Sequence, residues 1–284
     1  MEQKKEQTIK MFKYIDPDLV LKKYLGIKVK LVTYFGALLT AFWIYNENVS
    51  FPLFLICFYF SIFYARIGID IGFHRYFSHR SFKTSNFKKK LLLFWGSSIG
   101  VGSCLTYAGV HRTHHRHTDT NKDPHSPKNI GIFRVWFTLW DDNWSIDPSM
   151  VKDLIRDKTQ MFFHRNYFKL LTVWLVFLFL VSIAVGTLLP IVLLFGLPSA
   201  LTILSSGITN GLGHSPKFGY QSFETQDQSR NLHLHRFSLL ANGLHNNHHA
   251  KPESWTHNLN NKWYEFDLEA IIIKYFFKQQ VGVN

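Results

Sequence analysis

The stretch HRTHH, residues 111 to 115, places three histidines at positions i, i+3 and i+4. On an α-helix this spacing brings His111, His114 and His115 onto one face, within an arc of roughly 100°. Neutral imidazole binds zinc, copper, iron and nickel well, and histidine is the commonest metal ligand in proteins. The stretch therefore predicts a helix that offers three nitrogen ligands on one side.

Two further histidine clusters accompany this one. HNNHH repeats the same spacing with His245, His248 and His249, and HRYFSH supplies His74 and His79. A lone histidine beside apolar sequence is usually a core or surface residue, but three clusters with a repeated spacing are poorly explained in that way. Eight ligands also exceed the four that one tetrahedral zinc ion uses. The clusters together predict a centre with two metal ions.

The composition indicates a membrane protein. Hydrophobic residues make up 46% of the 284 residues, aromatic residues make up 17%, and the net charge is +13. A basic chain can bind nucleic acid, but we find neither a recognisable nucleic-acid-binding module nor an interleaved basic and aromatic groove. Anionic lipid headgroups fit the charge better. Cys57 and Cys104 lie far apart in apolar stretches and are predicted to be buried thiols, without a disulfide framework or an iron–sulfur cluster.

Four apolar stretches are predicted to cross the membrane: residues 29–45, 51–73, 167–186 and 188–208. At a rise of about 1.5 Å per residue, each is long enough for a hydrocarbon core of roughly 30 Å or close to it. The stretch 91–110 is also apolar. A crossing there would put HRYFSH and HRTHH on opposite sides of the membrane, so we expect a helix that lies at the interface or in the cytosolic part.

The distribution of lysine and arginine predicts the topology. Residues 1–30 hold eight of them, 74–165 hold fifteen and 215–284 hold seven, whereas the two turns between paired spans hold none. By the positive-inside rule, both termini and the large central loop are cytosolic. The predicted fold is one all-α integral-membrane domain, residues 1–284, with four transmembrane helices in two hairpins and a cytosolic helical cap that holds the metal site. A bacterial inner membrane is favoured over the endoplasmic reticulum.

The sequence resembles the membrane fatty-acid desaturase family, and is similar to stearoyl-CoA desaturases and bacterial acyl desaturases. The matching motifs are, in chain order, HRYFSHRSFK (74–83), HRTHHRHTDTNKDPHSP (111–127), NGLGH (210–214) and HNNHHAKPES (245–254). Their order and spacing extend over roughly residues 30 to 270. One motif alone is suggestive, and four together are highly specific.

The resemblance implies a di-iron centre, with two Fe²⁺/Fe³⁺ ions held by nine histidines. The implied ligands are His74, His79, His111, His114, His115, His214, His245, His248 and His249. Asn210 matches the position that holds a metal-bound water in that family. Asp123 and His125 match a family motif and are expected to orient ligand rings. The other histidines are not carried over as ligands, and His257 is expected to lie on the surface.

The reaction that the resemblance implies is O2-dependent desaturation of a fatty acyl chain, carried by CoA or a lipid. The chain has no cysteine cluster, no GxGxxG after a strand and no His-Pro-Gly-Gly of a fused cytochrome b5 domain. Two electrons are therefore expected from a separate donor of ferredoxin or cytochrome b5 type. A basic cap suits an acidic donor, and membrane lipids are further partners.

Two other functions are compatible with part of the histidine pattern. Histidine-box membrane hydroxylases and ketolases share the ligand style, but the long match through HRTHHRHTDTNKDPHSP favours a desaturase. A histidine-rich membrane zinc transporter or receptor is the alternative of another class. Such a protein places its ligands within the spans, facing a pathway, whereas these histidines follow the spans.

Two departures from the usual pattern carry expectations of their own. Asn242 stands where the family commonly has a glutamate, so a hydrogen bond to a ligand ring is expected to differ. Arg66 and Asp70 lie at i, i+4 within the second span, and buried charges there form either a structural ion pair or part of a substrate site. In the resembling family this stretch lines the far part of the acyl tunnel. We therefore expect Arg66 and Ile62 to restrict the chain segment beyond the new double bond.

Overall fold

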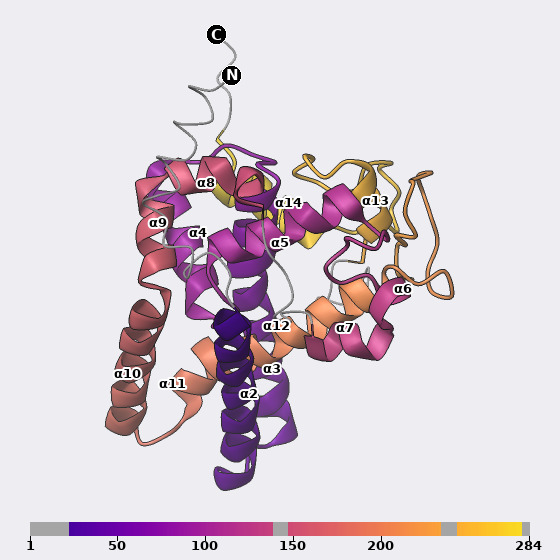
Figure 1. Cartoon of the computed structure of the whole chain (residues 1–284). Helices are drawn as coiled ribbons and strands as arrows, with labels where there is room; N and C mark the ends of the chain where they lie inside the picture. The colour runs from indigo at the N-terminus through magenta and orange to yellow at the C-terminus, as the bar shows by residue number, and fades with distance from the viewer. Residues whose placement is uncertain (1–22, 139–146, 234–242, 280–284) are drawn as a thin grey trace.

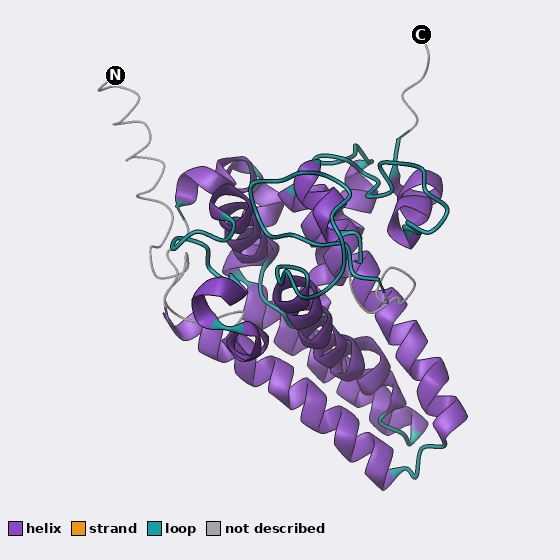
Figure 2. Ribbon diagram, turned by 90° about the vertical axis from the view of Figure 1, so that its right-hand side faces the viewer, coloured by secondary structure: helices purple, strands orange, loops and turns teal. Residues whose placement is uncertain are grey.

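The computed structural model of the chain describes residues 23–138, 147–233 and 243–279. Within these residues the regular secondary structure is helical, and extended pairing is confined to two isolated bridges. Long helices project to one end of the molecule, while short helices and loops gather at the other end (Figure 1; Figure 2). The predicted all-α class is confirmed.

The turns at the projecting end are tied together by one carboxylate. Helix α2 (Lys23–Asn46) is followed by a short turn that contains Glu47, and α3 (Phe51–Ala65) begins after it. The Glu47 carboxylate accepts hydrogen bonds from the backbone N–H of Leu188 (2.7 Å) and from the Thr187 hydroxyl (2.5 Å). Glu47 therefore joins the turn between α2 and α3 to the turn that precedes α11 (Leu189–Ile191).

Helix α3 continues directly into the π-helix η1 (Arg66–Ser78). Pro52 lies in the first turn of α3, where its missing N–H breaks no helical hydrogen bond. The predicted span ended at residue 73, but the helical hydrogen bonds continue until the His79 N–H, which donates to the His74 carbonyl (3.1 Å). His74 is thus held within the π-helix η1, and π-turns are frequent at functional sites.

The apolar stretch 91–110 is divided between two helices, α4 (Asn86–Ser98) and α5 (Cys104–His117). They contain 13 and 14 residues, fewer than the roughly 20 that a transmembrane helix needs. Between them Gly100 and Gly102 have φ values of +91° and +101°, which residues with a Cβ atom rarely adopt. No candidate span of the described residues lies here, as expected, whereas the expectation of a single helix is wrong.

A glycine contact sets the distance between α4 and η1. A Cβ atom on Gly68 would lie 2.9 Å from the Gly96 Cα, and a Cβ atom on Gly96 would lie 2.4 Å from the Phe73 ring. No side chain fits between the two backbones at this point. The helices therefore pack closely around a core that also includes Ile71 and Leu92, both with no exposed surface.

Three continuous helices among the described residues are long and apolar enough to cross a membrane: Phe51–Ser78, Tyr167–Val185 and Leu189–Leu212. They correspond to the second, third and fourth predicted spans. Tyr167–Val185 is α10, and the last helix comprises α11 (Leu189–Ile191), η3 (Val192–Gly196), α12 (Leu197–Gly207) and η4 (Ile208–Leu212). The first predicted span, 29–45, lies inside α2, which is not among the three.

Short helices and loops surround the end of η1 and α5. These helices are α6 (Pro127–Ile130), α7 (Ile132–Thr138), η2 (Pro148–Val151), α8 (Lys152–Arg156), α9 (Lys158–Arg165), α13 (His245–Ala250), α14 (Leu268–Ile272) and η5 (Ile273–Phe277). Arg112 of α5 fixes this region, because its guanidinium donates to the carbonyls of Phe77 (2.7 Å) and Ser78 (2.8 Å). The same guanidinium pairs with Asp153 at 2.6 Å, so Arg112 joins α5 to the end of η1 and to α8.

Candidate metal centre

The three histidine clusters and His214 meet in one place. HRTHH lies on α5, HNNHH begins α13, His74 is in η1 and His79 follows the end of η1. The ring nitrogens form two groups, each of four atoms within 4.8 Å of one another. The first group is His74, His79, His111 and His248, and the second group is His114, His214, His245 and His249. His115 combines with His248 and His249, so all nine predicted histidines are brought together.

The ring nitrogens of the first group face one another. His74 Nε2 lies 3.1 Å from His248 Nε2, and His79 Nε2 lies 2.7 Å from His111 Nε2. His115 Nε2 lies 2.8 Å from His248 Nε2, which places His115 beside this group. Nitrogen atoms from separate helices that converge on a common centre are the arrangement that a metal ion requires.

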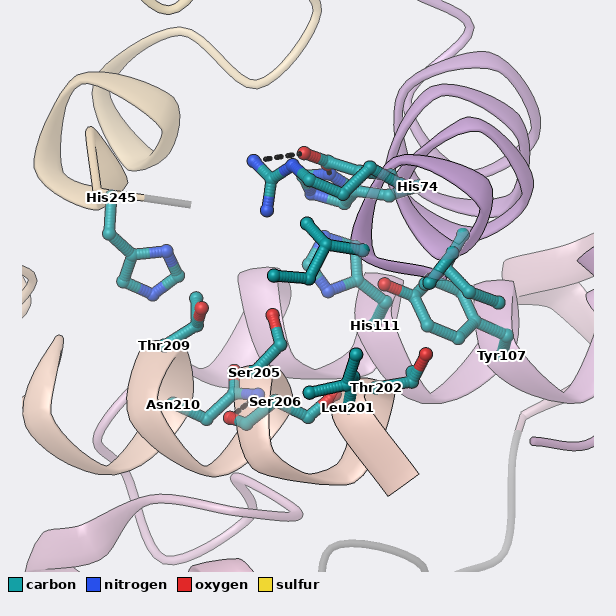
Figure 3. Close-up of a pocket in the computed structure, with 15 residues that line it drawn as sticks. His74, Tyr107, His111, Leu201, Thr202, Ser205, Ser206, Thr209, Asn210 and His245 are labelled. Atoms are coloured by element: carbon teal, nitrogen blue, oxygen red, sulfur yellow. Dashed lines mark hydrogen bonds and ion pairs between the residues drawn. The ribbon is translucent and has the colours of Figure 1, made fainter. Parts of the chain in front are cut away.

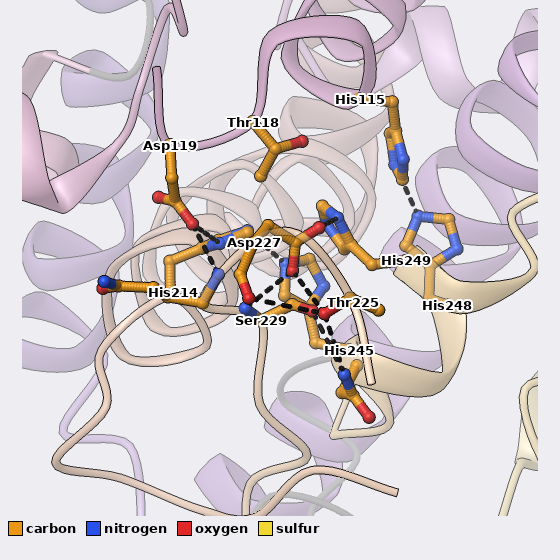
Figure 4. Close-up of polar contacts among 12 residues, drawn as sticks. His115, Thr118, Asp119, His214, Thr225, Asp227, Ser229, His245, His248 and His249 are labelled. Carbon is orange, nitrogen blue, oxygen red and sulfur yellow. Dashed lines mark hydrogen bonds and ion pairs between the residues drawn. The ribbon is translucent and has the colours of Figure 1, made fainter. Parts of the chain in front are cut away.

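Carboxylates orient four of these rings through Nδ1. The pairs are Asp70–His74 (2.6 Å), Asp123–His114 (2.9 Å), Asp119–His214 (3.3 Å) and Asp227–His249 (3.0 Å). Figure 4 shows Asp119 and Asp227 beside their histidines. A ring that donates its Nδ1 proton to a carboxylate keeps a lone pair on Nε2, which is the usual arrangement around a metal ion. Asp123 contacts His114, as expected of a residue that orients this predicted ligand.

The unpaired nitrogens fit a bound cation. His114 Nε2 and His249 Nε2 are buried and have no hydrogen-bond partner among the described residues. Buried acceptors are normally satisfied, and a metal ion satisfies a converging set of lone pairs. Burial, and then repulsion from neighbouring rings, lowers the pKa of His245 and His249 well below the ordinary imidazole value. These rings are neutral near pH 7, the form that binds metal, so the residues present fit two ions such as iron.

A cavity of about 90 Å³ adjoins the histidines. His74, His111 and His245 contribute to its lining, as Figure 3 shows. One wall comes from α3 and η1, and the opposite wall comes from α12 and η4. The first wall includes Ile62 and Arg66, and the second includes Thr202, Ser205, Thr209 and Asn210. A concave site that reaches metal-binding side chains is the natural place for a substrate.

Asn210 and His125 lie beside the second group. The Asn210 amide donates to the Ser206 carbonyl (2.9 Å), and the residue lines the cavity. The His125 ring stacks on His114 with 4.3 Å between the ring centroids. His125 therefore packs against a predicted ligand, as its sequence motif suggested. Asn242 lies outside the described residues.

The expectation that His257 is a surface residue is wrong. His257 is 1% exposed, its Nδ1 lies 3.2 Å from Arg75 Nη2, and its ring centroid lies 4.8 Å from that of His248. The Arg75 guanidinium also makes two 3.0 Å contacts with Asp267, which draws the segment around α14 over η1. No sequence pattern links these residues, because Arg75 and Asp267 are 192 positions apart.

The predicted Arg66–Asp70 ion pair is present, with 3.2 Å between Nη2 and Oδ2. Arg66 also pairs with Glu269 of α14, so it connects η1 to a second helix. Both members of the pair line the cavity, and Asp70 additionally holds His74. The two interpretations of this pair are therefore compatible, because a structural ion pair forms part of the cavity wall.

Comparisons with known proteins indicate the family to which the chain belongs. Residues 48–269 match the family model described as Fatty acid desaturase. The sn-1 stearoyl-lipid 9-desaturase of Synechocystis sp. is 32% identical over 219 residues, which cover 74% of this chain and 64% of that protein. The hex-5-enoyl-[acyl-carrier protein] acetylenase of Moorena producens is 31% identical, with 74% and 69% covered. A probable acyl-CoA desaturase of Schizosaccharomyces pombe is 30% identical, with 74% of this chain and 44% of that protein covered.

Proposed function

The chain belongs to the fatty acid desaturase family, and on that premise we propose that it is an O2-dependent fatty acyl desaturase whose nine clustered histidines hold two iron ions. One observation carries the proposal. The two four-nitrogen groups lie beside a cavity between α3–η1 and α12–η4, so a ligand in that cavity contacts the predicted metal ligands directly.

The residues of the chain have separate tasks in this reaction. The carboxylates Asp70, Asp119, Asp123 and Asp227 hold ligand rings in one tautomer and orientation. The nine histidines would hold two iron ions, which would supply the O2 activation needed to remove one hydrogen from each of two neighbouring methylene carbons. The cavity walls position those carbons beside His74 and His111. Two electrons and two protons complete the reduction of O2 to two waters, and a separate ferredoxin or cytochrome b5 type donor supplies the electrons.

The substrate is proposed as a fatty acyl chain on a lipid or protein carrier or on CoA. The names of the relatives include a stearoyl-lipid, an acyl-carrier-protein and an acyl-CoA enzyme, and these share the acyl chain. The direct test is to express the chain in a host that lacks its own desaturase and to analyse the fatty acids. New double bonds support the proposal. Hydroxylated or oxo products would instead support a hydroxylase or ketolase.

We further propose four spans in two hairpins, with the histidine-bearing end in the cytosol of a bacterial cell. Single-cysteine variants on a background without Cys57 and Cys104 test the sidedness with a membrane-impermeant maleimide. Lys122→Cys, in an exposed loop near the second group, is expected to react only from the cytosolic face. Ser50→Cys, in the exposed turn before α3, is expected to react only from the opposite face. Reaction of both from one side would contradict this topology.

The cavity wall is expected to limit the acyl segment beyond the new double bond. Ile62→Ala removes bulk from the α3 wall and should shift products toward longer acyl chains, since the cavity gains depth away from His74. Arg66 lines the same wall but is fixed by its carboxylate partners, so the neutral Ile62 gives the cleaner test. Ile56→Ala, an equal truncation at a 68% exposed position of α3, is the control and should leave the product profile unchanged. An identical profile for Ile62→Ala and the control would contradict the prediction.

A further inference from the structure

Carboxylates are unevenly distributed between the two histidine groups. Three rings of the second group contact Asp119, Asp123 or Asp227 through Nδ1. In the part of the chain that the structure describes, Asp70 is the one carboxylate that contacts a histidine of the first group. The two groups offer similar nitrogen ligands but differ in the charge placed one ring away from the metal.

The Asp70 carboxylate, unlike those of the second group, has arginine partners. Its carboxylate lies 3.2 Å from Arg66 Nη2 and 3.8 Å from Arg75 Nε. Both guanidinium groups are largely buried and also pair with Asp267 or Glu269, so two cations share three carboxylates beside the first group.

The carboxylates of the second group are held by neutral donors instead. Asp119 accepts from the Gln228 N–H (2.8 Å) and Asp123 accepts from the His125 N–H (3.1 Å). Asp227 accepts from the backbone N–H of Ser229 in the same loop (2.9 Å). Among the described ranges, no lysine or arginine forms an ion pair with any of the three. The second group thus has three negative charges without a cationic partner from the protein.

The difference in carboxylates between the two histidine groups affects how tightly each group would bind a metal ion. A carboxylate on the far nitrogen of a ligating histidine raises the basicity of that ligand, and its loss typically lowers metal affinity about 10- to 100-fold. We propose that the second group binds its metal ion more tightly than the first, so the centre fills the second group first and loses the ion of the first group first. This inference rests on the proposed function, because it assumes that both groups hold metal.

The order in which the two groups lose their metal ions would affect activity, because the groups contribute differently to the cavity lining. Two first-group residues, His74 and His111, line the cavity, whereas His245 is the one member of the second group that does so. Partial loss of metal therefore empties mainly the position that faces the cavity and leaves a tightly held ion behind. A preparation with one ion per chain is expected to be structurally intact and inactive.

The test is a titration of the full chain in detergent, freed of metal by a chelator, with Co²⁺ and with its absorption as the readout. Wild type is expected to bind two ions per chain in two steps that differ in affinity by at least about 10-fold. His249→Ala should remove the tight step, and His79→Ala should remove the weak step. Asp227→Asn should weaken the tight step by about 10- to 100-fold and leave the weak step unchanged.

Asp147→Asn is the matched control, because Asp147 is an exposed cap of η2 outside both groups. Elution as a single species in size-exclusion chromatography shows that each variant is folded. Two ions bound in a single step, or removal of the weak step by His249→Ala, would overturn the inference while leaving the di-iron proposal standing. Failure of the wild type to bind two ions would instead overturn the proposed function itself.

Discussion

His115→Ala is expected to lower the formation of unsaturated product by more than about 100-fold while the protein still inserts in the membrane. His115 Nε2 lies 2.8 Å from His248 Nε2 and 3.1 Å from His111 Nε2, and its ring stacks on His249 at 4.4 Å. It therefore contacts members of both groups, and alanine leaves no nitrogen at this position. Fatty-acid analysis of a desaturase-deficient host, together with iron content per chain, measures the effect.

His233→Ala is the matched control for this experiment. His233 is exposed and belongs to neither group, although its ring stacks on Tyr220 at 5.0 Å. The control is expected to keep near-normal activity and iron content. Near-normal product from His115→Ala would show that the shared di-iron centre is wrong.

Arg75→Met is expected to cost about 3–5 kcal/mol of stability, because it leaves a buried carboxylate without its partner. The Arg75 side chain is 1% exposed and makes two 3.0 Å contacts with Asp267 and one with the Trp255 carbonyl. Without this guanidinium the Asp267 charge is stranded beneath α14. Thermal unfolding in detergent should show the loss, and limited proteolysis should begin within residues 255–277.

The double variant Arg75→Met with Asp267→Leu provides the control. It removes both members of this pair, so Asp267 is no longer stranded, and it should be more stable than Arg75→Met alone. If the double variant loses the sum of the two single effects, the contact between Arg75 and Asp267 contributes no coupling energy and the interpretation of this segment is wrong.

The histidine clusters HRTHH and HNNHH could be identified from the sequence because their spacing is local, whereas His214 was implied only by the family resemblance. A spacing of i, i+3 and i+4 fixes which side of α5 and α13 carries the rings, whatever the rest of the fold. Cys57 and Cys104 were also predicted as buried thiols, and both are buried and free. Apolar length alone predicted the long helices Phe51–Ser78, Tyr167–Val185 and Leu189–Leu212 to within a few residues at most ends, since a membrane-spanning helix needs roughly 20 apolar residues.

The partners of the histidines could not be predicted in this way. Asp227 meets His249 across 22 positions, and Asp119 meets His214 across 95, through loops that have no periodic pattern. His257 was expected on the surface because nothing nearby in the sequence signals that Arg75 would bury it. The division of 91–110 into two helices depends on the positive φ values of Gly100 and Gly102. An apolar stretch of sequence does not reveal these backbone conformations.

The two four-nitrogen groups can be completed only late in biosynthesis, because both take histidines from α13 near the end of the chain. The ribosome completes η1 long before it reaches residue 245, so His74 and His79 leave the exit tunnel without the histidines of α13. Neither four-nitrogen group is complete in such a nascent chain, because each takes at least one ring from α13. Under the proposed function, the metal ions are therefore expected to be bound only after α13 has been translated and has docked beside η1 and α5.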